Sequence, residues 1–404
     1  MKLRKINNFD KFEVHGTLLL SEIEIEGVLK SDGNNYKLFF NTEHVLEINE
    51  SINECEFTTV KGETLFLING VQSGQNRNFP GRSEFEYLFT QIWLSSSHTY
   101  IPNSFDSVKV KFSGLKKNIK NSPFNIKINS DETEYTISIN TDNLKKKIAT
   151  LDDITLYSLC NTKRSITRSG ESNFQYENML QLKYNTDTNS DKCISDALNL
   201  SYIFSLITNE KHKIENIILS SNSDNYRVFL DLPFDFKEYH KTSITYITSD
   251  FLKQYSPKIF SFFYSNQNLL EDIFSGYIKL MYSTKFINHY LVDLLKLNEG
   301  LHRRFISNKK TNLVDRYKEL LRFLDDDLQI YLKNVVNYDE SLHNFLKDFR
   351  HYHSHYYPIE KKPKYTNDSI FNVSKYVLQL HKAFILTKIG IPSKDIITLL
   401  KNTH

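Results

Sequence analysis

The spacing of apolar residues changes along the chain, from strand-like alternation in the amino-terminal part to helical spacing in the carboxyl-terminal part. Up to about residue 140, short segments alternate apolar and polar positions or form brief apolar runs. Turn-forming clusters such as Ser31–Asn35 and Lys61–Glu63 separate them. The pattern predicts strands at Phe12–Leu20, Ile23–Leu29, Tyr36–Phe40, Cys55–Val60, Thr64–Ile68, Val108–Phe112 and Tyr135–Ile139. Strands at this spacing predict an antiparallel sandwich or barrel.

The middle of the chain combines both periods. Apolar residues recur at helical spacing over Ile194–Thr208, and two predicted strands follow at Ile214–Leu219 and Tyr226–Leu230. We expect Asp235–Asp250 to be a linker or a long loop. The domain boundary is therefore placed near residue 245.

Beyond this boundary the apolar residues follow helical spacing only. The predicted helices are Leu269–Met281, Phe286–Ile306, Leu313–Val335, Leu342–Tyr356, Ile370–Ile389 and Lys394–Leu400. Short connections between long helices predict an antiparallel bundle. The expected fold class is α+β, with a β-rich, sandwich-like or barrel-like domain at residues 1–245 and an all-α bundle at residues 246–404.

Composition narrows the functional classes. The chain has 404 residues and a formal net charge of +3, so any contact with RNA must come from local basic patches. Cys55, Cys160 and Cys193 form no closely spaced pair, which favours a reducing compartment. We find neither a leader-like start nor a membrane-spanning apolar run, and we expect a soluble cytoplasmic protein without a membrane partner. No nucleotide-binding fingerprint is present, and no cofactor is expected.

One late segment concentrates groups that bind phosphate and transfer protons. Arg350, His351, His353 and His355 crowd the last turns of the helix predicted at Leu342–Tyr356. Histidine titrates near neutrality, so it can act as a general base or acid. Arginine offers phosphate oxygens a permanently charged fork of donors. These residue types suit the cleavage of a phosphodiester without a metal ion.

The spacing Arg350-x4-His355 resembles the R-x4-6-H signature of HEPN domains, helical modules found in many metal-independent RNases. The upstream segment Leu294–Arg304, an apolar run with Glu299 followed by His and Arg, resembles a helix of ApeA-like HEPN proteins.

The amino-terminal half carries further resemblance. Gly16-Thr17-Leu18 and Gly27-Val28-Leu29 resemble the opening of the ApeA amino-terminal domain, and Phe105–Leu115 resembles a later strand of it. The helix-then-strand unit from Ile194 to Leu230 looks like the end of that domain. The whole chain resembles an ApeA-type antiphage protein.

The resemblance implies a role for each of these residues. His355 would be the general base or acid, Arg350 the phosphate clamp and His351 a supporting polar residue, while Glu299 would orient or balance the positive residues. The expected reaction is attack of a 2′-hydroxyl, which leaves a 2′,3′-cyclic phosphate and a 5′-hydroxyl. The implied biological role is abortive infection, in which host RNA such as tRNA is cut after a phage trigger of unknown identity. The amino-terminal domain would be a sensing or regulatory part.

Helical geometry adds an expectation about assembly. At roughly 100° per residue, Arg350 and His355 point about 140° apart, so one helix presents them poorly to one phosphate. Two copies packed around a twofold axis would bring Arg and His from both chains into one groove. HEPN RNases are typically dimers of this kind, and we expect a homodimer.

Less specific interpretations stay open. His351 and His355 stand at i, i+4, which suits two zinc ligands of a zinc-dependent hydrolase, although no third ligand is evident. The domain would otherwise be a non-catalytic HEPN module that binds RNA or a protein partner. Separately, the alternative for Glu299 is an ordinary salt bridge to Arg303, and for His353 it is a packing or hydrogen-bonding role. A basic set could track RNA or form a solvated face: Arg303, Arg304, Lys309, Lys310, Lys361, Lys362 and Lys364.

Overall fold

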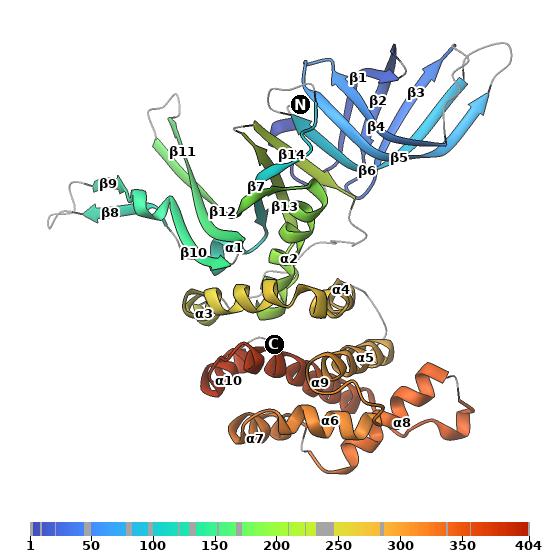
Figure 1. The fold of residues 1–404 in the computed structure, drawn as a ribbon, viewed down its shortest axis with the longest axis vertical. Coiled ribbons are helices and arrows are strands. Elements are labelled where there is room, and N and C mark those ends of the chain that lie inside the picture. Colours follow the sequence, from blue (N-terminus) through green and yellow to red (C-terminus); the bar gives the residue numbers. More distant parts are fainter. Residues whose placement is uncertain are drawn as a thin grey trace. The chain divides into compact units, whose positions relative to one another are not determined.

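The computed structural model (Figure 1) describes all residues except 1–2, 9, 21, 44–49, 78–82, 96–99, 120–121, 129–134, 152, 167–171, 209, 223, 232–245, 283–286, 337, 356 and 403–404. The chain divides into two compact units. The barrel unit comprises Met1–Lys116, Lys120–Ser201 and His212–Asp235, and the helical unit comprises Lys117–Ile119, Tyr202–Lys211 and Phe236–His404. The boundary predicted near residue 245 lies outside the described residues.

The barrel unit is built from antiparallel strands. They are β1 (Phe12–Leu20), β2 (Ile23–Ser31), β3 (Tyr36–Thr42), β4 (Ser51–Thr59), β5 (Thr64–Arg77), β6 (Ser83–Ser95), β7 (Phe105–Phe112), β8 (Phe124–Ile128), β9 (Tyr135–Ile139), β10 (Lys145–Leu151), β11 (Ile154–Ile166), β12 (Ser172–Thr188), β13 (Ile214–Ser221) and β14 (Asp224–Leu230). In the described part of the chain, six of them close into a barrel in the order β6-β3-β2-β1-β4-β5, because β5 also pairs with β6. The remaining long strands continue from β6 in the order β14-β13-β7-β12-β11-β10.

Strand β6 belongs to both parts of this sheet. One edge pairs with β5 over most of the strand, from Leu94 to Ser83. On the other edge, Ser83–Phe89 pairs with β3 inside the barrel, and Gln91–Ser95 pairs with β14. Tyr87 and Phe89 of β6 are fully buried in the barrel core.

The predicted sandwich or barrel is a barrel, and the α+β fold class is confirmed. The strands β6, β8, β10, β11 and β12 were not predicted from the sequence. The longest of them, β12, contains many polar residues and lacks a sustained apolar alternation, which is the signal that finds a strand in a sequence.

Two glycines explain part of the sequence pattern at the start of the chain. Gly16 of β1 lies opposite Gly27 of β2 on one side and opposite Thr59 of β4 on the other. A Cβ atom on Gly16 would lie 2.3 Å from the Thr58 carbonyl oxygen and 2.8 Å from the Phe57 ring. The close approach of β1 and β4 therefore requires glycine at this position.

The helical unit contains α3 (Tyr246–Ser265), α4 (Gln267–Tyr282), α5 (Ile287–Phe305), α6 (Leu313–Arg322), α7 (Asp326–Val335), α8 (Ser341–His355), the 3-10 turn η3 (Ile359–Lys361), α9 (Asn367–Lys388) and α10 (Ser393–Asn402). Helix α9 is the central element, because it is buried along most of its length and packs against α5, α6, α7 and α10. Helix α8 packs against α5 and α6. None of the helices among the described residues has the length and apolar character needed to cross a membrane.

Two sequence expectations are wrong here. The helix predicted over Leu313–Val335 is two helices, because Asp325 caps α7 by accepting a hydrogen bond from the amide of Leu328 at 3.0 Å. The linker expected at Asp235–Asp250 is wrong for its last residues, because α3 begins at Tyr246; the rest of this range lies outside the described residues. Pro257 inside α3 weakens its helical signal in the sequence.

The substitution Gly16→Ala tests the barrel closure. We expect it to lower the free energy of unfolding of the barrel unit by about 1–3 kcal/mol, because β1 and β4 must separate to admit the methyl group. Urea unfolding followed by the fluorescence of Trp93, the single tryptophan, measures this unit. The matched control is Gly74→Ala, since a Cβ there meets its nearest neighbour at an ordinary 3.4 Å. Equal midpoints for the two variants would contradict the steric argument.

Candidate functional site

Helix α8 carries Arg350, His351, His353 and His355, the residues singled out from the sequence. The carboxylate of Asp339 accepts a hydrogen bond from the amide of Ser341 at 2.6 Å, which stabilises the first turn. Leu346 and Phe349 are fully buried on the face that packs into the bundle. Arg350 follows directly, at the edge of this buried face, with its side chain 25% exposed.

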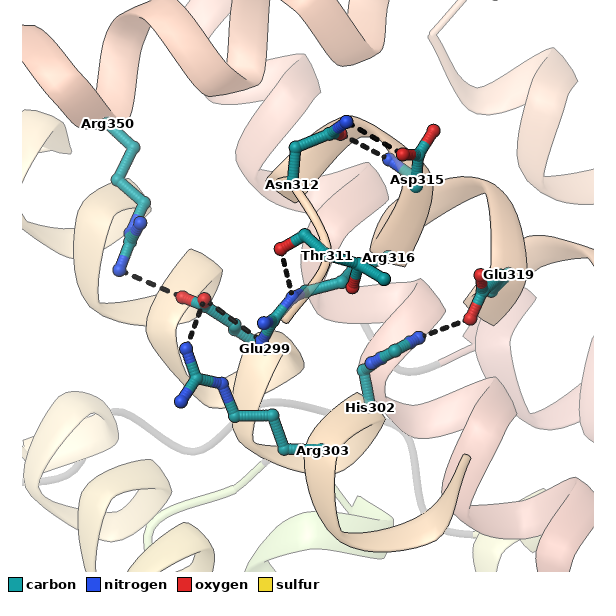
Figure 2. Close-up of polar contacts among 9 residues, drawn as sticks. All are labelled: Glu299, His302, Arg303, Thr311, Asn312, Asp315, Arg316, Glu319 and Arg350. Atoms are coloured by element: carbon teal, nitrogen blue, oxygen red, sulfur yellow. Dashed lines mark hydrogen bonds and ion pairs between the residues drawn. The ribbon is translucent and has the colours of Figure 1, made fainter. Parts of the chain in front are cut away.

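The carboxylate of Glu299 on α5 is the centre of the charged cluster (Figure 2). Its Oε2 lies 2.8 Å from Nη2 of Arg350 on α8. Its Oε1 lies 3.1 Å from Nη1 of Arg316 on α6 and 3.2 Å from Nη2 of Arg303, one turn further along α5. The site therefore joins three helices through one acidic side chain. The salt bridge of Glu299 to Arg303 and its contact with Arg350 coexist.

The three arginines differ in exposure. Arg316 is 3% exposed, whereas Arg303 is 58% exposed and faces solvent. The Nε of Arg316 also donates to the carbonyl of Thr311 at 3.1 Å, which fixes the guanidinium against the loop before α6. Burial lowers the pKa of Arg316; Glu299 opposes this effect, and the charges of Arg303 and Arg350 add to it. Glu299 is thus the main compensation for a buried cation.

A second pair extends the cluster along α5. His302 has a fully buried side chain, and its Nε2 lies 2.6 Å from Oε2 of Glu319 on α6. Arg304 turns the other way, toward the carboxylate of Asp272 at 2.5 Å and the carbonyl of Leu269. Glu299, His302 and Arg304 belong to the segment that resembles a helix of ApeA-like HEPN proteins. Each of them contacts a different part of the helical unit.

The histidines of α8 form a second group near the end of the helix. The rings of His351 and His355 lie 5.9 Å apart between centroids, and both lie beside Tyr357, at 6.5 and 5.9 Å. Among the described residues, no hydrogen bond or ion pair joins Arg350 to His355. Within one chain, Arg350 and His355 therefore contact different groups.

His353 occupies a different environment. Its ring packs on Phe349 at 4.4 Å, and its Nε2 lies 3.3 Å from the hydroxyl of Tyr365. Burial lowers the pKa of His353, and the nearby His289 and Lys362 lower it further. These contacts agree with the packing interpretation.

Buried polar residues that the sequence did not reveal hold α5 in place beneath the site. Asn298, next to Glu299, is fully buried; its amide donates to the carbonyl of Val377 at 3.0 Å, and its Oδ1 lies 2.7 Å from Nδ1 of His381. Burial lowers the pKa of His381 to about 3, with a smaller contribution from Lys382, so the ring is neutral and Nδ1 donates. A buried Asn or His has no distinguishing signal in the sequence.

Several of the basic residues noted in the sequence interact with other side chains of the same chain. Arg303 and Arg304 form the ion pairs described above. Lys361 lies over the ring of Tyr357 at 5.2 Å, and Lys362 lies over that of Tyr365 at 5.6 Å. In the described part of the chain, no three His, Cys, Asp or Glu side chains are grouped as metal ligands would be, so one chain supplies His351 and His355 with no third ligand there.

Comparison with known families gives a match to the amino-terminal part of the chain. The model of ApeA N-terminal domain 1 matches residues 5–275. The chain belongs to the ApeA family. No curated protein and no solved structure matches it. The matched range contains the barrel unit's strands and reaches into α4, so it ends before Glu299 and Arg350. Membership in the ApeA family is consistent with antiphage defence.

The charge compensation by Glu299 can be measured. We expect Glu299→Ala to lower the free energy of unfolding of the helical unit by about 3 kcal/mol, because Arg316 would stay buried beside two other cations. Adding Arg316→Met should recover at least half of this loss, since the unpaired charge is removed and the volume is retained.

Urea unfolding monitored by far-ultraviolet circular dichroism measures both variants. Glu271→Ala, which removes an exposed acidic side chain of α4, is the control and should cost little. A larger loss in the double variant than in Glu299→Ala alone would contradict this account.

Proposed function

We propose that the helical unit is a metal-independent HEPN endoribonuclease that acts in antiphage defence by abortive infection. The observation that carries the proposal is the ion pair of 2.8 Å between Arg350 and Glu299. Arg350 lies five residues before His355 on the same helix, α8. The ion pair restrains a guanidinium at the partly exposed edge of the bundle. The resemblance of Arg350-x4-His355 to the HEPN signature supplies the reaction class.

The proposed mechanism assigns each group one role. The 2′-oxygen of RNA attacks the adjacent phosphorus, and the bond from phosphorus to the 5′-oxygen breaks. The 2′-hydroxyl loses its proton and the departing 5′-oxygen gains one; His355 acts as the general base or the general acid in one of these two transfers, and water completes the other. Arg350 stabilises the negative charge that develops on the phosphorane. His351 is the supporting polar residue, and Glu299 orients Arg350.

The complete site is proposed to form in a homodimer. Within one chain Arg350 contacts Glu299, whereas His355 lies with His351 and Tyr357, so each chain offers two partial groups. A twofold axis near the end of α8 would let one chain's arginine face the other chain's histidine across a groove. Each histidine would then find its complementary partner in the second copy.

The proposed substrate is host RNA, such as tRNA or another structured RNA, and the trigger comes from the phage. Residues 1–245 would sense or transmit this trigger, and residues 246–404 would carry the nuclease. A non-catalytic binding module is the alternative that the following experiment separates.

Substitutions at α8 test the chemistry. We expect His355→Ala to reduce RNA cleavage by about 10²–10⁴-fold, as the loss of a general acid or base does. Arg350→Ala should cost about 10²–10³-fold, and Arg350→Lys should recover little because Lys lacks the planar fork. Both alanine variants should also abolish protection of a bacterial culture from phage.

Purified full-length protein, total RNA and gel analysis of the 2′,3′-cyclic phosphate ends provide the measurement. His289→Ala and Arg322→Ala, at exposed positions of the same unit, are the matched controls. Cleavage should persist in EDTA; stoichiometric zinc with activity lost on chelation would support the hydrolase alternative. Folded Arg350→Ala and His355→Ala proteins that still protect would favour the binding module.

Mixing the two inactive variants tests the shared site. The twofold axis gives the groove two Arg–His pairs, each with one residue from either chain; in a heterodimer of Arg350→Ala with His355→Ala chains, one pair would lose both groups and the other would keep both. We therefore expect co-expressed, differently tagged chains to regain about half the activity of the wild-type dimer. Each homodimer is its own inactive control, and light scattering gives the mass. Heterodimers as inactive as their parents, or an active monomer, would contradict the shared groove.

A further inference from the structure

An exposed aromatic ring lies directly beside the proposed catalytic histidine. The side chain of Tyr357 is 41% exposed, although its ring is large and apolar. It lies two residues beyond the end of α8, before Pro358 and the turn η3. The tyrosines at the bundle core, such as Tyr317 and Tyr376, are fully buried instead. Tyr357 is therefore not explained by packing into the core.

The surroundings of this ring are polar and cationic. Its centroid lies 5.9 Å from that of His355, with an angle of 33° between the planes, and 6.5 Å from that of His351. The ammonium group of Lys361 lies over the ring at 5.2 Å from the centroid. One short segment thus places an aromatic face, a titratable group and a cation next to one another.

The aromatic face and the cation match two parts of a nucleotide, the base and the phosphate. Every nucleobase has a π-face that stacks on an aromatic side chain, and a lysine can pair with the phosphate of the same or the next nucleotide. We infer that Tyr357 and Lys361 form a subsite that binds one unpaired nucleotide of single-stranded RNA next to the bond that is cut. This inference rests on the proposed nuclease function and adds to it a residue that selects unpaired substrate.

The pairing of Tyr357 with Lys361 favours RNA over a protein partner. Lysine is depleted at the centre of protein–protein interfaces, because its charge must lose water there. Lys361 lies over the ring itself rather than at a distant rim. Bases inside a duplex have no free face, so the subsite would distinguish loops and single strands from paired RNA.

Binding measurements on a cleavage-deficient protein test this subsite without requiring turnover. In full-length His355→Ala protein, Tyr357→Ala should weaken the binding of a short single-stranded RNA containing 2-aminopurine by about 5- to 100-fold. Tyr357→Phe should stay within about twofold, because the ring is retained. Lys361→Ala should weaken binding and reduce its dependence on salt. Phe371→Ala, which removes another exposed aromatic ring of the helical unit, is the matched control and should bind normally.

Cleavage by protein with an intact His355 is a separate arm. There, Tyr357→Ala should raise KM for single-stranded RNA more than it lowers kcat, which a loss of folding would not do. Unchanged binding of Tyr357→Ala overturns the subsite, whether or not the wild-type protein cleaves RNA. Cleavage that depends on His355 but not on Tyr357 would leave the nuclease proposal standing alone. Dissociation of the wild-type dimer by Tyr357→Ala would identify the ring as an interface residue and also overturn the inference.

Discussion

One carboxylate holds the charged side of the helical unit together. Arg303, Arg316 and Arg350 come from two neighbouring helices and from α5 itself, and Glu299 forms an ion pair with each of them. Breaking a buried ion pair on one side leaves an uncompensated charge that costs several kcal/mol. A shift of α6 or α8 would therefore separate Arg316 or Arg350 from the carboxylate with which it forms an ion pair. The positions of the three helices, and with them the end of α8, depend on this carboxylate.

The parts of the fold that could be predicted are those in which local pattern and tertiary environment agree. Helices α5, α8 and α9 have one sustained apolar face or are apolar over most of their surface, and β1 to β3 alternate clearly. The predictions failed where tertiary contacts decide the local structure. Strand β12 is stabilised by pairing with β7 and β11 despite its polar sequence, and one capping side chain, Asp325, divides an apolar pattern into α6 and α7.

The site shows the same division. Arg350, His355 and Glu299 were predicted because a short motif on one helix and a segment on another resemble those of a known family; the structure brings Arg350 and Glu299 together, and the roles of the three residues stay a prediction. Arg316 could not be found in this way, because an arginine in the sequence is far more often a solvated residue than a buried one. Its role follows only from the distance between α6 and Glu299. The contact of Asn298 with His381 likewise joins residues 83 positions apart.

The charge balance around Glu299 bears on what Arg350 can bind. Glu299 pairs with three guanidinium groups, so its one negative charge cannot neutralise all of them; Glu319 offsets part of the charge of Arg316, and of the three arginines only Arg303 is largely exposed to screening by solvent. A second acid paired with Arg350 itself would have neutralised the guanidinium and obliged a phosphate to displace that acid. A single acid restrains the guanidinium while leaving positive charge for an incoming anion. Because the whole chain carries only +3, attraction to a nucleic acid must arise from such local imbalances rather than from a long-range field. The ion pair that fixes Arg350 is therefore compatible with phosphate binding.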